Sequence, residues 1–311
     1  MPLEPVPLES VDLKQMEALL AEETQRYLDW YRWDFNGTAR LLRQLVAAHR
    51  LGGMALLDGT QVVGYTYYVI EEQKALIGDA YVIDAYASAE AERLLMATSI
   101  EAVRHFPQIR RVEAQPMMLR YAYTHPRAER HERLFLELNL QDTRWPKNVS
   151  LPGSYRLEAW NWRNEEDAAQ ILYRAYRNHL DAEMNDQYRS PSKARAYLNN
   201  MINYPACGAF TPQASFFIQD KESGAHVGVV CSCMAGNVGH IAQLCISPES
   251  QQKGLGRLLM AAALSQFVDK GCDFATLTVT SANQHGLHLY ESLGFKERAR
   301  LAAYVWAVWP F

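Results

Sequence analysis

The segment from Gln251 to Arg257 reads Gln-Gln-Lys-Gly-Leu-Gly-Arg and lies between an expected strand and an expected helix. The first N–H groups of a helix have no main-chain partner, and the helix dipole places partial positive charge at the same end. Gly254 and Gly256 remove side chains that would keep an anion away from these donors. Lys253 adds positive charge at the edge, as Arg257 does. The segment predicts a pyrophosphate site.

Taken alone, two glycines at a helix start are equally compatible with a simple tight turn. A phosphate loop of the NTPase kind needs Gly-Lys-Ser/Thr, which is absent here. A dinucleotide fingerprint needs a third glycine where Leu259 stands. Neither nucleotide-binding motif fits the segment.

A second group of residues, Asn283, Gly286 and Tyr290, falls about one helical turn apart and shares one face of a short expected helix. Asn283 could hydrogen-bond an amide-bearing chain, and the Tyr290 hydroxyl could donate a proton at the end of that chain. The alternative is that Asn283 caps the helix and Tyr290 packs in the core.

Together these motifs resemble the GNAT superfamily of acyl-CoA N-acyltransferases. The family pattern Gln/Arg-x-x-Gly-x-Gly/Ala, after a strand that ends Val-x-Pro, reads here as 246–248 followed by 251–256. The second family signature is present as Asn283, as Tyr290 seven positions later, and as Gly294-Phe295. The resemblance covers roughly residues 154–305.

The resemblance implies an α/β (α+β) fold whose two central parallel strands splay apart, with acetyl-CoA as co-substrate and no metal. By position the splayed strands are 240–247 and 274–280. The implied cofactor-binding residues follow the strand, the loop and the short helix: Leu244, Cys245, Ile246, Gln251, Gln252, Lys253, Gly254, Leu255, Gly256, Arg257, Asn283 and Tyr290.

The resemblance also implies direct attack of a primary amine on the thioester, with Tyr290 protonating the departing thiolate. Acetylases of ribosomal-protein N termini carry a glutamate base at the position of Thr278, and threonine cannot replace it. Histone-acetylating members carry theirs at the position of His240. Because a histidine pKa suits proton transfer near neutral pH, His240 is the candidate base, and a histidine satisfied at a strand end is the alternative.

The elements that must position these residues recur twice along the chain. In the second half the pattern predicts strands at 215–219, 226–235, 240–247 and 274–280, a long helix from 254 and a short helix at 285–293. The first half repeats the order: a hairpin at 53–59 and 62–70, a strand at 79–87, a long helix at 90–103, a strand at 110–118 and a short helix at 131–140.

This duplication predicts two tandem GNAT-like domains, each a mixed, mostly antiparallel sheet with helices on both faces. A linker at 151–155 would separate domain 1–150 from the catalytic domain 154–311. Alignment on the long helices places Glu90 and Glu92 where the second copy has its glycines, and Phe135 in place of Tyr290. The first copy is therefore predicted to be degenerate and inactive.

Composition limits the remaining possibilities. The 311 residues have a formal net charge of −4 with both signs scattered, so there is no broad basic face for nucleic acid or membranes. No apolar run is long enough to cross a bilayer and the start lacks signal-peptide features, so a cytoplasmic location is expected. The five cysteines, an odd number in the second half, are expected to be buried free thiols without a zinc site.

The leading hypothesis is an N-acetyltransferase acting on a small-molecule or peptide amine. The alternative is an acyl-CoA-binding regulatory or structural module without activity. The aromatic cluster Trp30, Tyr31, Trp33 and Phe35 could line the acceptor site, or form ordinary helix core. Neither the acceptor nor the oligomeric state is readable from the residues, because acceptors bind through variable loops.

Overall fold

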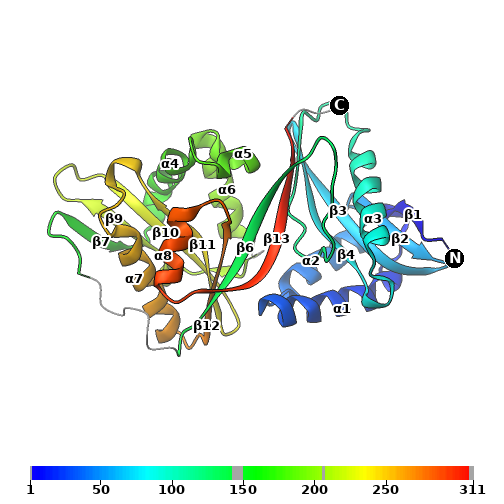
Figure 1. Ribbon diagram of the computed structural model, residues 1–311, viewed down its shortest axis with the longest axis horizontal. Coiled ribbons are helices and arrows are strands. Elements are labelled where there is room, and N and C mark those ends of the chain that lie inside the picture. The colour runs from blue at the N-terminus through cyan, green and yellow to red at the C-terminus, as the bar shows by residue number, and fades with distance from the viewer. Residues whose placement is uncertain (1, 142–149, 205–206, 308–311) are drawn as a thin grey trace. The chain divides into compact units, whose positions relative to one another are not determined.

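The computed structural model describes residues 2–141, 150–204 and 207–307 (Figure 1). The chain forms two compact units. Unit 1 consists of Met1–Arg133 and Arg300–Phe311, and unit 2 consists of Leu134–Ala299. The predicted linker at 151–155 lies inside unit 2, because the boundary between the two compact units falls earlier, between residues 133 and 134. The division into 1–150 and 154–311 stays a prediction.

Unit 1 contains a mixed sheet in the order β1-β2-β3-β4-β5-β13, followed by the start of β6. Pairing is antiparallel from β1 to β4, and β4 pairs with β5 in parallel. In chain order its elements are β1 Glu4–Pro7, α1 Leu13–Tyr31, α2 Asn36–Ala47, β2 Gly53–Asp58, β3 Gln61–Glu71, β4 Lys74–Val82, α3 Ala89–Val103 and β5 Arg111–Ala114.

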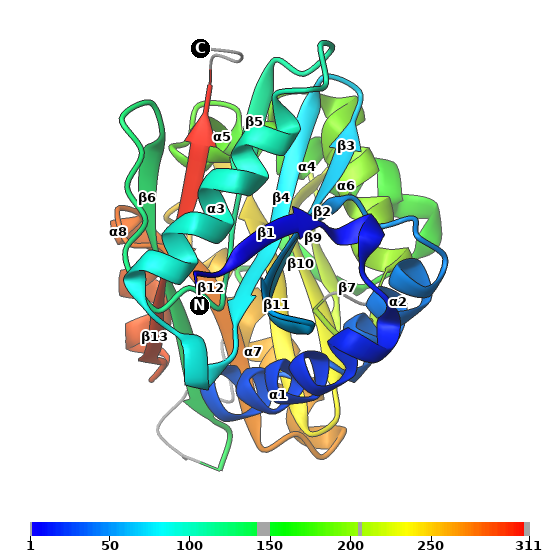
Figure 2. The same cartoon turned by 90° about the vertical axis from the view of Figure 1, so that its right-hand side faces the viewer.

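Local signals explain where the helices of unit 1 begin. Asp12 caps α1, and its backbone N–H donates back to Gln15 Oε1 at 3.0 Å in a capping box. Ser88 caps α3 by accepting the Ala91 N–H at 3.1 Å. Helices α1 and α2 cover one face of the sheet, and Figure 2 shows α3 lying across the other.

Two strands contribute to both units: β6 Glu129–Asn139 and β13 Lys296–Trp306. The short helix predicted at 131–140 is wrong, because this segment forms β6. Leucines stand at every second position from 134 to 140, and all four are buried in one hydrophobic cluster. Side chains that alternate in this way suit a strand with one face in a core, and tertiary pairing overrides the helical reading.

Unit 2 contains the sheet order β13-β6-β12-β11-β10-β9-β7, with the short β8 pairing β10. Its first strand begins at Tyr155, at the end of the predicted linker. In chain order its remaining elements are β7 Tyr155–Ala159, α4 Glu165–Tyr176, α5 Asp181–Met184, α6 Pro191–Asn203, β8 Ala209–Phe210, β9 Phe216–Asp220, β10 His226–Ala235, β11 Val238–Ile246, α7 Leu255–Asp269, β12 Phe274–Thr280 and α8 Gln284–Ser292.

The sheet of unit 2 has one hydrophobic cluster on each face. Helices α7 and α8 supply Leu259, Phe267 and Leu287 to one cluster, and α4 and α6 supply Leu172 and Leu198 to the other. On β11, Gly239 allows α7 to approach closely, because a Cβ there would lie 2.4 Å from the Phe267 ring. The sheet is therefore covered on both faces.

The predicted elements of the second half are confirmed to within a few residues at their ends. In the first half the hairpin and the long helix are also confirmed. The strand expected at 79–87 occupies 74–82 instead, and the strand expected at 110–118 ends at Ala114. Because β5 ends at Ala114, the chain that follows it is free to lie beside the open part of β4.

Candidate active site

The parallel strands β11 and β12 of unit 2 separate along their length. Their pairing runs from Val238 opposite Phe274 to Ile241 opposite Leu277, and no further pairs join the described residues, although β11 continues to Ile246. On its other edge β11 carries a one-residue bulge, because Cys231 pairs with Gln243 while Ser232 pairs with Ile241. A bulge bends its strand, so the carboxyl halves of β11 and β12 open apart.

The start of α7 lies at the open end of β11. Gly254 caps the helix in the left-handed region (φ 78°) and no side chain caps the helix. The first intrahelical bond is donated by the Leu258 N–H to Gly254 O at 3.2 Å. Among the described residues, nothing accepts a hydrogen bond from the N–H groups of residues 252–257. These donors and the helix dipole are available to an anion.

The two glycines of this loop have different roles. Gly254 provides a backbone conformation that residues with a Cβ rarely adopt. Gly256 is helical, and a Cβ at this position would meet only Leu289 Cδ2, at 3.4 Å. Gly256 is therefore not needed for packing, and its missing side chain leaves room beside the free N–H groups.

The two basic residues of the loop already have protein partners. Lys253 Nζ donates to the Tyr155 hydroxyl and to Glu249 O, both at 3.1 Å. Arg257 Nη2 donates to Ser292 Oγ of α8 at 2.5 Å and joins the two helices. Gln251 Nε2 donates to Ile246 O at 3.1 Å, which ties the loop to the end of β11. The positive charges of Lys253 and Arg257 contribute to the electrostatic field at the loop and need no direct contact with an anion.

Asn283 caps α8, as the alternative interpretation anticipated. Its Oδ1 accepts the Gly286 N–H at 2.9 Å, which leaves only Nδ2 to donate elsewhere. Gly286 is required by this cap, because a Cβ there would lie 3.0 to 3.2 Å from the Asn283 amide atoms. The cap holds α8 in place at the end of β12.

Tyr290 is half-buried on α8, and its ring lies 6.1 Å from that of Phe295 in an edge-on arrangement. Its hydroxyl forms no hydrogen bond with any described residue. Burial, followed by the nearby Cys245 thiol and the Asp181 carboxylate, raises the pKa of Tyr290 well above its usual value. The phenol is therefore protonated at neutral pH and can act as a proton donor.

His240 lies at the paired end of β11. Its Nδ1 is 3.0 Å from Thr276 Oγ1, its ring stacks on Phe135 at 6.4 Å, and only 8% of the residue is exposed. Four residues separate it from Leu244, which corresponds to about 13 Å along a strand. The structure thus brings Tyr290 and the β11 segment 244–246 together and places His240 farther down the strand.

Sequence reasoning missed one residue near this site, Asp181 on α5. It is 8% exposed, and its Oδ1 accepts the Thr280 hydroxyl at 2.5 Å, at the end of β12. The loop between α4 and α6 carries no motif that marks this aspartate. Only the pairing with Thr280, 99 positions away in sequence, reveals it.

The corresponding region of unit 1 is filled by the protein itself. β4 and β5 pair only from Lys74 opposite Arg111 to Ile77 opposite Ala114, and β4 continues to Val82. Asp79 Oδ1 accepts the Met118 N–H at 3.1 Å, so the chain after β5 crosses beside the open part of β4. At the start of α3, the Glu92 carboxylate accepts backbone N–H groups of the same segment.

The helix starts also correct the predicted alignment of the two copies. Ser88 caps α3 and Gly254 caps α7, so Glu90 corresponds to Gly256, and Glu92 lies two positions farther into the helix than expected. The match of Phe135 to Tyr290 fails because Phe135 lies on a strand. The start of α3 contains no glycine. Unit 1 also lacks a counterpart of α8 with its tyrosine, because the described residues 115–128 after β5 form no helix.

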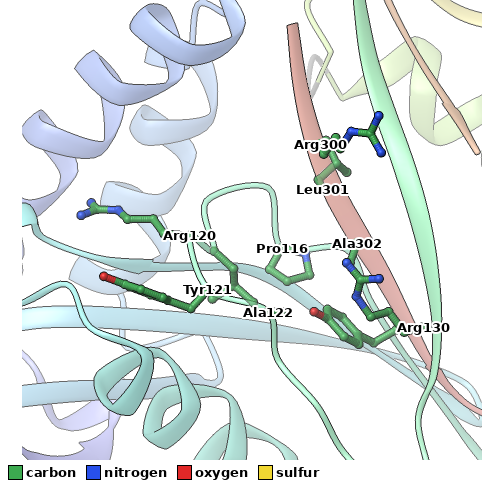
Figure 3. Close-up of a pocket in the computed structure, with 10 residues that line it drawn as sticks. Pro116, Arg120, Tyr121, Ala122, Arg130, Arg300, Leu301 and Ala302 are labelled. Carbon is green, nitrogen blue, oxygen red and sulfur yellow. The ribbon is translucent and has the colours of Figure 1, made fainter. Parts of the chain in front are cut away.

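A cavity of about 190 Å³ lies beneath this irregular segment of unit 1. It is lined by residues 116 and 119–122, by Arg130 and by β13 residues that include Arg300 and Tyr304. Figure 3 shows the Arg120 side chain directed away from Arg130 and Arg300. Arg120 pairs with Asp84 at 2.6 Å and Arg300 with Glu132 at 3.0 Å. The cavity has none of the free helix-start donors found in unit 2.

Other expectations about side chains can be compared directly with the structure. All five cysteines are free, and Cys207 is the one that is only partly buried. In the aromatic cluster, Tyr31 and Phe35 belong to the core of unit 1, and Trp30 and Trp33 are partly buried. Among the described residues no group of His, Cys, Asp and Glu could hold a metal ion. In the same residues, no helix has the length and apolar character required to traverse a bilayer.

Comparison with known proteins agrees with this geometry. The profile of the Acetyltransferase (GNAT) family matches residues 154–295. The chain also superposes on a tandem GNAT protein from the clavulanic acid biosynthesis pathway with a TM-score of 0.61 and 14% identity, over 98% of both chains. Residues 154–295 belong to the GNAT superfamily. Over the whole chain the fold is that of a tandem GNAT protein, and the predicted fold class is confirmed.

Similarity to a second structure supports the fold alone. A GCN5-related N-acetyltransferase from Sphaerobacter thermophilus aligns with a TM-score of 0.68 and 11% identity, over 97% of this GNAT chain and 95% of that one.

The chain is similar to several acetyltransferases, some over a short segment at higher identity and others over most of the chain at lower identity. A mycothiol acetyltransferase from Tsukamurella paurometabola is 39% identical over 70 residues, which span 22% of this chain and 24% of the relative. A mycothiol acetyltransferase from Thermobispora bispora is 25% identical over 280 residues, which span 84% of this chain and 87% of the relative. These relatives are acetyltransferases, and the prediction that this GNAT chain is an acyltransferase enzyme is confirmed.

Proposed function

We propose that unit 2 transfers an acetyl group from acetyl-CoA to a primary amine by direct attack within a ternary complex. The observation that carries this proposal is the start of α7, where consecutive N–H groups are free and Gly256 leaves space beside them. These donors fit a pyrophosphate. The unpaired edge of β11 at Leu244 to Ile246 suits an extended amide-bearing arm, because such an arm can pair with a strand edge.

The residues of this chain would then act as follows. Residues 252–257 bind the diphosphate, Asn283 Nδ2 can donate to a passing amide, and backbone N–H groups of β11 near Cys245 stabilise the negative charge that develops on the thioester oxygen. Acetyl-CoA supplies the activated acyl group, and positioning of the two substrates accounts for much of the rate.

Tyr290 both gives and receives one proton in the proposed reaction, so it is unchanged at the end of the cycle. The amine nitrogen forms a bond to the carbonyl carbon, and the carbon–sulfur bond breaks. Tyr290 gives its proton to the departing thiolate, and the proton that the nitrogen loses returns to the tyrosinate. An amine with a pKa near 10 must lose one further proton before it attacks. His240 is the proposed acceptor of that proton. Because His240 lies farther down β11 than Leu244, the proton would reach it through a relay of hydrogen-bonded groups.

The buried cysteines support direct attack over an acyl-enzyme. Burial raises the pKa of the Cys245 thiol to about 12. The thiolate is the nucleophilic form of cysteine, and it is scarce at neutral pH under these conditions. Cys245 therefore contributes its main chain to the site and its thiol stays neutral.

The acceptor proposed here is a small-molecule or peptide amine. Mycothiol, which the names of several relatives specify, is one candidate. The proposed location is the cytoplasm. Consumption of acetyl-CoA with a panel of amines distinguishes the enzyme from an acyl-CoA-binding module, because the module binds acetyl-CoA without turnover.

A Tyr290→Phe substitution tests the mechanism. Phenylalanine keeps the ring contact with Phe295 and removes only the hydroxyl. We expect kcat to fall by at least about 100-fold while the Kd of acetyl-CoA changes by less than about threefold. Tyr304→Phe, which removes a buried hydroxyl from unit 1, is the matched control and should leave both quantities unchanged. Unchanged kcat in the Tyr290 variant would remove this role.

The role of His240 is tested by the pH profile. If His240 accepts the proton, the acidic limb of the kcat profile should disappear in His240→Gln while the affinity for acetyl-CoA persists. A profile that keeps the wild-type acidic limb assigns the proton to a different acceptor.

A further inference from the structure

A buried carboxylate, Asp181, lies where the splayed strands of unit 2 end. It is the first residue of α5, in the loop region that joins α4 to α6. Its Oδ1 accepts the hydroxyl of Thr280, the last residue of β12, at 2.5 Å. This bond fixes the aspartate at the open end of β12.

The second oxygen of Asp181 has no donor in the described structure. His179 Nδ1 lies 3.5 Å from Oδ2, but the same nitrogen accepts the Asp181 backbone N–H at 3.2 Å. A ring nitrogen that accepts a hydrogen bond carries no proton to donate. Among the described residues no lysine or arginine pairs with Asp181, although the residue is 8% exposed.

Asp181 also lies near the proposed proton donor. Its charge contributes to the raised pKa of Tyr290, after burial and Cys245, and to that of Tyr176. Tyr176 stacks on Tyr188 with ring centroids 4.1 Å apart, and Gln243 of β11 donates to the Tyr188 hydroxyl at 2.9 Å. The carboxylate thus lies at the end of β12, and its charge reaches Tyr176 and Tyr290.

A nearly buried carboxylate with a free oxygen and no lysine or arginine beside it is energetically unfavourable until a cation joins it. A primary amine with a pKa near 10 is such a cation at neutral pH. We propose that Asp181 Oδ2 binds the ammonium group of the acceptor and positions its nitrogen beside Tyr290. The inference rests on the proposed function and specifies a positively charged acceptor.

The carboxylate therefore selects amines over uncharged acceptors. An alcohol of the same shape would leave Asp181 without its counter-ion. This preference for amines separates a role in acceptor binding from a purely structural role of Asp181.

The experiment compares Asp181→Asn with wild type on glucosamine, cysteamine, spermidine and a short peptide with a free N terminus. Asparagine keeps the size of the side chain and can still accept from Thr280. For the amine that the wild type uses best, we expect the KM to rise at least about 10-fold. The Kd of acetyl-CoA should stay within about twofold.

Asp186→Asn is the matched control. Asp186 is also buried, lies in the same loop region and pairs with Lys193 at 2.5 Å. Its loss should lower stability without raising the acceptor KM. Asp181→Glu, which retains the charge, should recover a large part of kcat/KM and covers the case in which Asp181→Asn does not fold.

The outcomes are distinct. An unchanged acceptor KM in Asp181→Asn, or an equal rise in Asp186→Asn, overturns the inference and leaves the acetyltransferase proposal standing. A wild-type protein that acetylates none of the amines contradicts the proposed function first and the inference with it. A rise in KM confined to Asp181→Asn supports both.

Discussion

Both carboxylate oxygens of Glu92 accept the backbone N–H of Arg120, at 3.1 and 3.0 Å. Glu92 also accepts the Tyr121 N–H at 2.9 Å. The first turn of α3 in unit 1 thus carries a negative side chain that binds the chain following β5. In unit 2 the first turn of α7 carries Gly256 and leaves its donors free. The same strand and helix arrangement serves a structural role in one unit and a proposed anion site in the other.

Glu92 is therefore expected to contribute to stability and not to acetyl-CoA binding. Glu92→Gln replaces a charged acceptor of the partly buried Arg120 and Tyr121 N–H groups with a neutral one, and because hydrogen bonds to charged groups are stronger than neutral ones this change costs about 1 to 2 kcal/mol. Denaturant unfolding should show this loss, while calorimetry should give an unchanged Kd for acetyl-CoA. Glu90→Gln, on the exposed side of the same turn, is the control and should change stability by less than about 0.5 kcal/mol. Weaker acetyl-CoA binding in Glu92→Gln would contradict the structural role.

Gly256→Ala separates the anion site from the fold. The new Cβ meets only Leu289 Cδ2 at 3.4 Å, and alanine favours the helix by up to about 1 kcal/mol. We expect stability to be equal or higher while the Kd of acetyl-CoA rises at least about 10-fold, because the methyl group occupies space beside the N–H donors.

The control for this variant is Gly236→Ala in the turn between β10 and β11. Gly236 has a positive φ of 57° and open space around it, so alanine should cost about 1 kcal/mol of stability through backbone strain. It should leave acetyl-CoA binding unchanged. Wild-type affinity in Gly256→Ala would show that no phosphate lies against this residue.

Cys245→Ser tests direct transfer. Because burial holds the pKa of this thiol at about 12, the thiol is neutral during turnover and does not carry the acetyl group. We expect kcat to stay within about threefold of wild type, and mass spectrometry of a quenched reaction to find no acetylated Cys245. Cys231→Ser, which also places a hydroxyl in the core, controls for the effect on stability. Detection of an acetyl-thioester on Cys245 would replace direct attack with a two-step mechanism.

Asp79 should make unit 1 less stable as the pH rises. Burial raises the pKa of this carboxyl from 3.8 to about 6, against the opposing effect of its hydrogen bonds from Tyr27, Met118 and Ala80. Between these two values the folded state holds one proton more than the unfolded state, so stability decreases with increasing pH. The difference corresponds to about 3 kcal/mol.

Asp79→Asn removes this dependence because an amide does not titrate. Its oxygen can still accept the Met118 and Ala80 N–H groups, and its NH2 can donate to the Tyr27 hydroxyl oxygen. We expect the variant to be more stable than wild type at about pH 8, by up to about 3 kcal/mol, with the difference shrinking toward about pH 4. Denaturant unfolding at several pH values measures this difference, and Asp29→Asn on the exposed side of α1 is the control. A wild-type protein that gains stability relative to the variant between about pH 5 and pH 8 would contradict the sign.

The order and type of most elements follow from the sequence alone. Periodicity and turn residues predicted the strands of unit 2, the long helices of both units and the glycine-rich start of α7. These are local properties, since a helix start depends on residues within one turn and a strand on the alternation of neighbouring side chains. Tyr290 and the loop 251–257 could be proposed as site residues for the same reason, because their motifs are local in sequence.

The tertiary structure decided what depends on distant pairing. Residues 131–140 form a strand because four alternating leucines are buried against other strands of unit 2, and a single segment does not reveal its pairing partners. The alignment of the two helix starts depended on where each cap lies in space. Asp181 became a candidate because Thr280, 99 positions away, holds it at the open end of β12. Sequence can locate a chemical group along the chain, but its neighbours across the fold are set by packing, which is non-local.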